Sequence, residues 1–364
     1  MSVPYDFRKI SRTKNQDDFC IEFWKIHVSR DYPGEGGLVT ASRSTLKYHC
    51  TCNNEKESNN YEMKNQVVHT EFVDTGYGKN YVKLLQLRRE GDAHHIQELE
   101  VSVELTLNNQ REYLYGDNTD IIATDSQKNT VYILARKFGV KTPEQFALLL
   151  CNHFLTKYSH VDKAKVYIEQ APWKRMEIDG DKHVHAFLIS DEATRFCDCV
   201  QARGGKPLVS AGLKKMKILK TTQSAFTGFV KDEFRTLPDA NDRLFCTVVD
   251  SKWWYNTVDH VNFDKVWDTV KQVILETFAG PAHEGVFSPS VQNTLFITEK
   301  HVLAGVPQIE KMEMELPNVH YFGVDFTRFP KINFENNTNE IYMPTDKPSG
   351  NIRAAIERKH MSKL

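Results

Sequence analysis

From about residue 69 onward, apolar and polar positions alternate along the chain in a regular way. In the stretch ELEVSVELTL, apolar side chains alternate with polar ones, and this period of two predicts a half-buried antiparallel strand. The apolar positions of that strand are Val101, Val103, Leu105 and Leu107. The same alternation recurs at Met312, Met314 and Leu316. Further strands are predicted at YVKLLQLRR, AKVYIEQAPW, HVHAFLI, KKMKILKTT and RLFCTVVD.

Two other segments have the spacing of amphipathic helices. Thr142 is the predicted N-cap of the first, Pro143 is its first residue, and Gln145 completes a capping box. Ser288 and Pro289 predict the start of a third helix further along. The apolar stripes of the first two helices are Phe146, Leu149, Leu150, His153 and Phe154, and Phe263, Val266, Val270, Val273 and Ile274.

The order of these elements repeats itself as two strands, a helix and two strands. This order predicts an α+β fold of two tandem units, 69–205 and 206–361, each an antiparallel four-stranded sheet with helices on one face. Such sheets have open edges, so we expect edge-to-edge assembly into a closed ring. Residues 1–68 lie outside the pattern and include the polar stretch CTCNNEKESNNYEMKNQ. We expect a poorly packed extension there, with IEFWKIHV as its strand candidate.

Composition narrows the class of protein. The chain has 364 residues, of which 40% are hydrophobic and 26% charged, enough for one large or two smaller domains with real cores. Its net charge of -1 gives no reason to expect a nucleic-acid partner. No apolar run is long enough to span a bilayer, and MSVPYDFRKISR lacks the apolar region of a secretory signal, so we expect no membrane association. Seven cysteines in a chain of this size predict reduced thiols in an intracellular protein.

The last three residues, Ser362, Lys363 and Leu364, match the tripeptide that peroxisomal import receptors bind. They follow the polar stretch ERKHM, where a receptor would reach them. We therefore predict a peroxisomal location and an import receptor as a partner. The alternative is a frayed tail that no receptor binds.

Four segments occur in a characteristic order: TGYGKNYVKLL, GDNTDIIATDSQKNTVYILARKFG, KTTQSAFTGFVKDEF and ELPNVHYFGVDF. With them the chain resembles the urate oxidase family from about residue 69 to its end. The resemblance implies the tunnelling fold (T-fold), with two units per chain in a barrel-like homotetramer and active sites between subunits. It implies oxidation of urate by oxygen and water to 5-hydroxyisourate and hydrogen peroxide, with no metal and no organic cofactor. A peroxide product fits a peroxisomal address.

Urate is a flat, anionic heterocycle, so holding it requires an aromatic face, a fork of donors and a matched amide. The resemblance makes Phe226 the stacking ring and makes Arg243 and Gln292 a polar clamp on two sides. A guanidinium binds planar acceptors through two donors at once, which a lysine cannot do. Val291 adds a backbone N–H close to a predicted helix start, where free amides favour an anion.

The resemblance also assigns the residues that move protons. Lys79 and Thr124 match the catalytic pair, and a neutral Lys79 amine would take the proton of the Thr124 hydroxyl, making it a base toward urate. His320 matches the third member, a proton relay. Lys79, Thr124 and Asp125 are expected from one subunit, and the clamp, Phe226 and His320 from another. The remaining contacts are Asn318 at the oxygen and water site, the Asp125 backbone N–H toward urate, and Ile352 as a wall.

Each of these residues also has an ordinary structural interpretation. Taken singly, Lys79 suits a solvated turn, Thr124 a strand-to-loop segment, and Phe226 a core position. Their joint occurrence in matching segments favours the functional interpretation. Thr227 departs from the pattern, because some relatives carry a large aromatic residue at this position. We expect this difference to affect substrate affinity.

Three rival functions remain to be compared. A catalytically silent purine binder would lack Lys79, Thr124 or His320, but all three positions are filled. A zinc-dependent pterin or purine enzyme of the same fold would use the pair His183 and His185, but no third ligand is evident, so we expect both to be strand residues facing one side. A structural scaffold has only the expected ring assembly in its favour. His49, Cys50 and Cys52 have no second ligand pair at a zinc-site spacing and are interpreted as structural.

Overall fold

The computed structural model describes residues 6–12, 18–28, 39–49, 70–332 and 340–359. The chain divides into two compact units, Met1–Glu71 and Phe72–Leu364. The first unit holds a three-stranded antiparallel sheet, in which IEFWKIHV lies within the second strand. Its strands are β1 (Asp6–Arg12), β2 (Asp18–Val28) and β3 (Val39–His49). Cys50 and Cys52 lie outside the described residues, and the poor packing of this unit stays a prediction.

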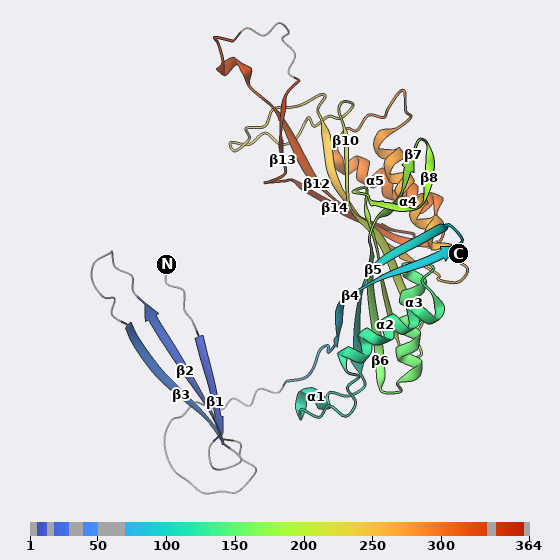
Figure 1. Cartoon of the computed structure of the whole chain (residues 1–364). Coiled ribbons are helices and arrows are strands. Elements are labelled where there is room, and N and C mark those ends of the chain that lie inside the picture. Colours follow the sequence, from blue (N-terminus) through green and yellow to red (C-terminus); the bar gives the residue numbers. More distant parts are fainter. Residues whose placement is uncertain (1–5, 13–17, 29–38, 50–69, 333–339, 360–364) are drawn as a thin grey trace, which may run out of the picture. The chain divides into compact units, whose positions relative to one another are not determined.

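The second unit is built on one antiparallel sheet of nine strands (Figure 1). The strand order is β13-β12-β11-β10-β9-β6-β5-β4, and β14 pairs with β12 on the same edge as β13. The strands are β4 (Tyr77–Glu90), β5 (Ala93–Leu107), β6 (Val161–Gln170), β9 (Thr194–Ala202), β10 (Leu208–Lys220), β11 (Phe245–Tyr255), β12 (Ile309–Gly323), β13 (Tyr342–Thr345) and β14 (Asn351–Glu357).

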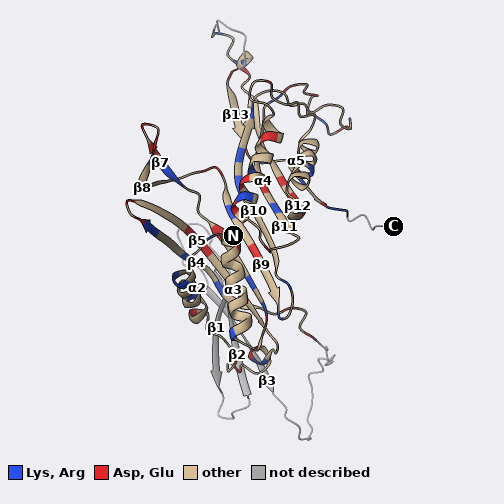
Figure 2. Cartoon of the chain, turned by 90° about the vertical axis from the view of Figure 1, so that its right-hand side faces the viewer, with Lys and Arg blue, Asp and Glu red and all other residues tan. Residues whose placement is uncertain are grey.

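Four long helices cover one face of this sheet, the face turned toward the viewer in Figure 2. Basic and acidic positions are interspersed over that side (Figure 2). The helices are α2 (Thr124–Phe138), α3 (Pro143–Lys157), α4 (Phe263–Ala279) and α5 (Val291–Gly305); the short α1 (Arg111–Leu114) and the 3-10 turn η1 (Phe326–Arg328) lie outside this layer. Within the described ranges, no helix has the length and apolar content needed to cross a membrane.

The core lies between the sheet and the helices, as the alternation predicts. Val101, Val103 and Leu105 are fully buried, whereas Glu104 between them is exposed on the other face of β5. Met312 and Met314 are buried in the same way on β12. Each such side chain contributes roughly 1.5–3 kcal/mol by leaving water. The predicted antiparallel α+β architecture is thus confirmed.

The helix caps confirm one of the two predicted helix starts and correct the other. The Thr142 hydroxyl accepts the Gln145 N–H at 3.1 Å, as expected for a capping box at α3. The third predicted helix, α5, begins at Val291, two residues after the predicted Pro289, and its cap is Ser290. Ser288 is instead a buried bridge residue, because its backbone pairs with the segment around Ser224.

Helix α2 is missing from the sequence-based elements. Thr124, expected in a strand-to-loop segment, is the first residue of this helix. The sequence hides α2 for two reasons: Ala123 at the cap position has no side-chain acceptor, and the only buried apolar residues are Val131 and Leu134.

The prediction that HVHAFLI supplies a strand of the main sheet is wrong. This segment lies in β8 (Asp181–Ile189), which pairs with β7 (Trp173–Ile178) in a separate hairpin. Its expected place in the sheet belongs to β9, between β6 and β10. The sequence does not predict β9, because its buried positions are Arg195, Cys197 and Cys199 and so do not form an alternation of aliphatic and polar residues.

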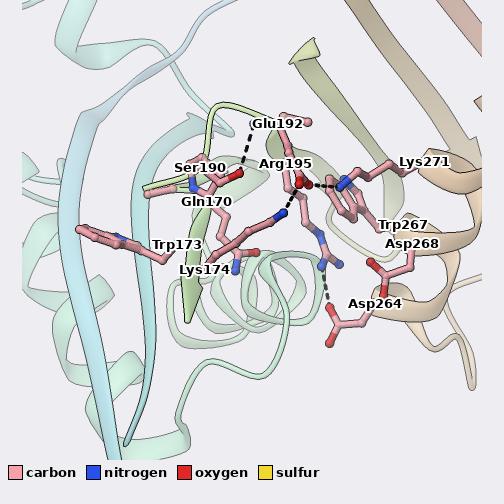
Figure 3. A pocket seen from close by; sticks show the side chains of 13 residues that line it. Gln170, Trp173, Lys174, Ser190, Glu192, Arg195, Asp264, Trp267, Asp268 and Lys271 are labelled. Carbon is pink, nitrogen blue, oxygen red and sulfur yellow. Dashed lines mark hydrogen bonds and ion pairs between the residues drawn. The ribbon is translucent and has the colours of Figure 1, made fainter. Parts of the chain in front are cut away.

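Arg195 of β9 forms ion pairs with two of the helices that cover the sheet, α3 and α4. Its guanidinium bonds the Glu144 carboxylate of α3 at 2.7 Å and the Asp264 carboxylate of α4 at 2.6 Å. Burial raises the pKa of Glu144, and the charge of Arg195 opposes that rise. Beside this triad is a pocket of about 410 Å³, in which Glu192 also pairs with Lys271 at 2.6 Å (Figure 3).

Candidate functional site

Lys79 lies on an irregular part of the edge strand β4. A Cβ atom on Gly78 would come within 1.8 Å of the Val103 carbonyl oxygen, so this position requires glycine. The pairing with β5 shifts register between Lys79 and Val82, and Tyr81 in between has a φ of 58°. This bulge changes the direction of the strand just after Lys79, whose side chain is half-buried.

The start of α2 lies close to Lys79. The Tyr77 hydroxyl accepts the Ile122 N–H at 2.9 Å and so fastens β4 to the residues that lead into the helix. The Asp125 carboxylate accepts from Lys128 Nζ at 2.6 Å, and this bond lowers the pKa of Asp125; the charge of Lys79 lowers it further. Asp125 lies in the first turn of α2, so its backbone N–H has no acceptor within the helix. Its carboxylate, in contrast, is already bound by Lys128. The structure therefore brings Lys79, Thr124 and Asp125 together.

A second group of predicted residues lines a cavity of about 390 Å³ at the other end of the sheet. Four predicted residues share it: Phe226, Arg243, Asn318 and His320. Apolar side chains, among them Leu237, Phe245 and Phe322, form much of the remaining wall. A flat heterocycle with polar edges suits this mixture of surfaces.

Phe226 is fixed by its backbone on both sides. Its N–H and carbonyl bond the carbonyl and N–H of Ala240 at 2.8 and 3.0 Å. Gly228 has a φ of 72°, which lets the chain turn so that the Phe229 ring stacks on Phe226 with centroids 4.5 Å apart. The guanidinium carbon of Arg243 lies 5.1 Å from the centroid of the Phe226 ring. Ring and guanidinium thus form a single platform.

Arg243 has a donor that nothing satisfies among the described residues. Its backbone N–H bonds the Ser224 carbonyl at 2.8 Å, which fixes the start of the side chain. The side-chain Nε is buried without a hydrogen-bond partner in the described part of the chain, and burial lowers the pKa of Arg243. Since buried donors are normally paired, the Arg243 Nε is available to an acceptor that the described residues do not supply.

The first residues of α5 lie next to the same platform. The Ala225 N–H donates to the Ser288 carbonyl at 3.0 Å, and the Ser288 N–H donates to the Gln223 carbonyl at 2.8 Å. Helix α5 follows directly, with Val291 buried and Gln292 exposed in its first turn. Both residues are therefore close in the chain to the backbone that carries Phe226.

Strand β12 supplies the last members of this group. The Asn318 N–H bonds the Gly350 carbonyl at 2.8 Å, and the His320 ring stacks on Phe322 at 5.7 Å. Ile352 is on β14, where it pairs with Leu316 of β12 and packs against the core. It is two residues from the loop that holds Asn318.

The two groups of residues do not meet within one chain. Lys79 is on β4 at one edge of the sheet, and His320 is on β12 near the other, six strand spacings away. At about 4.8 Å per spacing, the path across the sheet is about 29 Å. A purine cannot bridge that distance, so one purine cannot contact both groups of the same chain.

Two contributors to the cavity end were missing from the sequence-based set. Phe229 stacks on the platform, and Asp242 holds the preceding turn by accepting the Thr222 hydroxyl at 2.7 Å, a bond that lowers the pKa of Asp242. The spacing F-T-G-F, with a glycine between two aromatic residues, was the available signal for Phe229.

His183 and His185 lie on the β7–β8 hairpin, not on the main sheet. Their rings are 4.6 Å apart, and His183 Nδ1 accepts the backbone N–H groups of His185 and Ala186 at 3.2 and 3.1 Å. The His94 ring is 5.9 Å from that of His185. Across the described ranges, no three His, Cys, Asp or Glu side chains are grouped so as to hold a metal ion.

Fold and cavity together define an antiparallel α+β protein with a polar and aromatic cavity at one end of its sheet and a lysine beside a helix start at the other. A profile of the uricase family matches residues 75–200 and 209–353. The chain is 50% identical to a uricase of Danio rerio and 48% identical to one of Oryctolagus cuniculus, each over 294 residues, 81% of this chain and 97% of the relative. The crystal structure of uricase from Arthrobacter globiformis superposes with a TM-score of 0.73 at 33% identity, covering 82% of this chain and 98% of that one.

The chain belongs to the uricase family. It is thus an oxidoreductase with the function of a urate oxidase.

Proposed function

We propose that this chain oxidises urate with oxygen and water to 5-hydroxyisourate and hydrogen peroxide, at an active site assembled from two copies of the chain. One copy supplies Lys79, Thr124 and Asp125. The other copy supplies Phe226, Arg243, Val291, Gln292, Asn318, His320 and Ile352. The observation that carries this proposal is the strand order, which places these two groups, each an incomplete half-site, six strand spacings apart in one chain, about 29 Å across the sheet.

The two half-sites supply different chemical groups that complement each other around a bound anion. The cavity at β12 has an aromatic platform and an unpaired guanidinium donor, which hold a planar anion. The other half has an amine, a hydroxyl and the uncapped start of α2. Free amides at the starts of both α2 and α5 favour a negatively charged ligand. Urate between the two halves would therefore meet a positive helix end on each side.

The proposed chemistry needs a base and no redox group of the protein. In its neutral form, the Lys79 amine takes the proton of the Thr124 hydroxyl, which then removes a proton from urate, and His320 relays protons to solvent. The electron-rich urate supplies two electrons to oxygen, which leaves as hydrogen peroxide, while water supplies the oxygen atom of the hydroxyl group. Asn318 orients oxygen and water above the urate plane, and no cofactor takes part.

We further propose two tandem T-fold units, 69–205 and 206–361. A repeated local feature supports this division. In β4, Gly78 lies against the Val103 carbonyl and Tyr81, three residues later, has a φ of 58°. In β10, a Cβ on Gly212 would come within 2.2 Å of the Ser251 carbonyl, and Lys215, again three residues later, has a φ of 64°. A glycine and a bulge at one spacing in the first strand of each unit are what a duplication would leave.

The assembly that we propose is a barrel-like homotetramer with a tunnel. Strands β4 and β13 end the order of the main sheet, so each presents an edge to a neighbouring copy. Joining β4 of one copy to the far edge of another would bring unlike half-sites together. Such an arrangement closes a ring by repetition.

We propose a peroxisomal location, with an import receptor binding Ser362, Lys363 and Leu364. These residues lie outside the described part of the chain, so the proposal rests on the tripeptide itself and on the peroxide product.

The activity is tested by following the loss of urate's ultraviolet absorbance in air, with EDTA present. Rapid loss with formation of peroxide supports the proposal, and Lys79→Ala should remove nearly all of it. Loss that EDTA abolishes would favour a metal-dependent enzyme. No loss from a folded assembly would favour a silent purine binder.

The composite site is tested by mixing two inactive variants, Lys79→Ala and Arg243→Met. Co-expressed in one cell, they form mixed assemblies in which some sites combine the intact Lys79 of one chain with the intact Arg243 of the other. Random mixing restores about a quarter of wild-type activity. Each variant expressed alone is the control. If mixing restores nothing although mixed assemblies are isolated through two affinity tags, the site does not lie between copies.

A further inference from the structure

We propose that Lys220 is a positioning residue for substrate binding, because its ammonium group fastens the Phe226 segment to the residues that begin α5. This inference rests on the proposed function, in which Phe226, Arg243 and the start of α5 hold urate. Lys220 is the last residue of β10 and does not line the cavity.

Each hydrogen-bond donor of the Lys220 ammonium group has an acceptor. Its Nζ donates to the Phe278 carbonyl at 3.1 Å, to the Val286 carbonyl at 2.7 Å and to Ser288 Oγ at 2.8 Å. A lysine ammonium has three donors, so all of them are satisfied. The three acceptors belong to the end of α4 and to the loop between α4 and α5, segments that are far from β10 in sequence.

Ser288, which Lys220 holds, is itself hydrogen-bonded to both parts of the substrate clamp. Its backbone bonds Gln223 and Ala225, directly before Phe226, at 2.8 and 3.0 Å. Its hydroxyl also accepts the Thr294 hydroxyl at 2.8 Å, inside the first turns of α5. One serine thus connects the aromatic platform with the helix start that carries Val291 and Gln292, and Lys220 fixes that serine.

The surroundings of Lys220 explain why a cation is suited to this place. Helix α4 has no basic residue in its own last turn, so Lys220 supplies the positive charge that its carbonyl end favours. The rings of Phe245 and Phe278 lie 6.0 and 5.4 Å from Nζ. No carboxylate pairs with the amine among the described residues, and burial lowers its pKa. The group is held by directional bonds to backbone and hydroxyl, which fix geometry more strictly than an exposed ion pair does.

Loss of these bonds should loosen the clamp and leave Lys79 and Thr124, the pair that removes the proton from urate, untouched, since both belong to the opposite half-site. Hydrogen bonds to charged groups are among the stronger ones, so Lys220→Met should raise KM for urate about tenfold. The value of kcat should stay within about threefold of wild type, as expected when ground-state and transition-state binding weaken together. A purely structural role would lower the thermal midpoint without this split.

The experiment measures kcat and KM for Lys220→Met, with urate binding measured separately under nitrogen, where oxidation cannot occur. Lys265→Met on α4 is the matched control, because its side chain is exposed and has no hydrogen bond or ion pair in the described part of the chain. It should leave KM unchanged. If Lys220→Met does not fold, Ser288→Ala removes only one acceptor and should raise KM about threefold. Arg243→Met reports on the clamp itself.

A raised KM and a weakened binding of urate in Lys220→Met or Ser288→Ala, with kcat largely kept, support the proposal. Unchanged KM and unchanged urate binding in the folded variants, together with weakened urate binding in Arg243→Met, overturn the role of Lys220 and leave the proposed site intact. Unchanged urate binding in Arg243→Met refutes the clamp, and the role of Lys220 falls with it.

Discussion

Glu299 is a carboxyl group buried in the core without a charge partner among the described residues, and its replacement by glutamine should stabilise the protein in a pH-dependent way. The side chain is fully buried on α5, and neither carboxylate oxygen has a hydrogen bond of ordinary geometry in the described part of the chain. Burial raises the pKa of Glu299 from 4.5 to about 8; the nearby Met314 amide opposes the rise and the charge of Glu313 adds to it. Glu299→Gln keeps the shape of the neutral acid and removes its ionisation.

The size of the effect follows from the shift in pKa. Below pH 4.5 the carboxyl group is protonated in both folded and unfolded chains, so its ionisation does not affect the free energy of unfolding. Above pH 4.5 the unfolded chain ionises first, and folding must return the proton, at about 1.36 kcal/mol per pH unit. Stability is thus lost between pH 4.5 and about 8, and the loss reaches roughly 3 kcal/mol at pH 7.

The assay is thermal unfolding of wild type and Glu299→Gln at several pH values between 5 and 9, at constant ionic strength. At about 2 °C per kcal/mol for a domain of this size, the variant should unfold about 6 °C higher at pH 7. The two proteins should converge near pH 5. Glu276→Gln, an exposed glutamate on α4, is the control and should show no such divergence. A constant difference in midpoint at all pH values would refute the reasoning.

Two further substitutions probe the packing of the sheet. Arg195→Met leaves the Glu144 carboxyl buried without its partner and should lower the free energy of unfolding by roughly 3–5 kcal/mol in urea, whereas Lys174→Met, which breaks an exposed pair, should cost less than about 1 kcal/mol; equal losses would contradict the role of burial. Gly78→Ala places a methyl group 1.8 Å from the Val103 carbonyl, so urate oxidation should fall to near the level of Lys79→Ala, and full activity would show that β4 can move aside.

Local patterns in the sequence predicted much of the fold. The alternation around Val103 located β5, and the capping residues at Thr142 located α3, because both patterns reflect contacts within a few residues of each other. Helix α2 and strand β9 were not predicted. The cap of α2 is an alanine, and β9 turns Arg195 inward toward a partner 51 residues away.

The sequence by itself determined the family, the chemical types at the site and the existence of most elements. Only the tertiary structure decided where those residues lie: Lys79 at one edge of the sheet, His320 near the other, and Arg243 with an unpaired buried donor. Strand order and burial come from contacts between residues far apart in the chain, and no local period encodes them. For the same reason Lys220 looks like an ordinary strand-end lysine in the sequence, although its three hydrogen bonds reach partners 58 to 68 residues away.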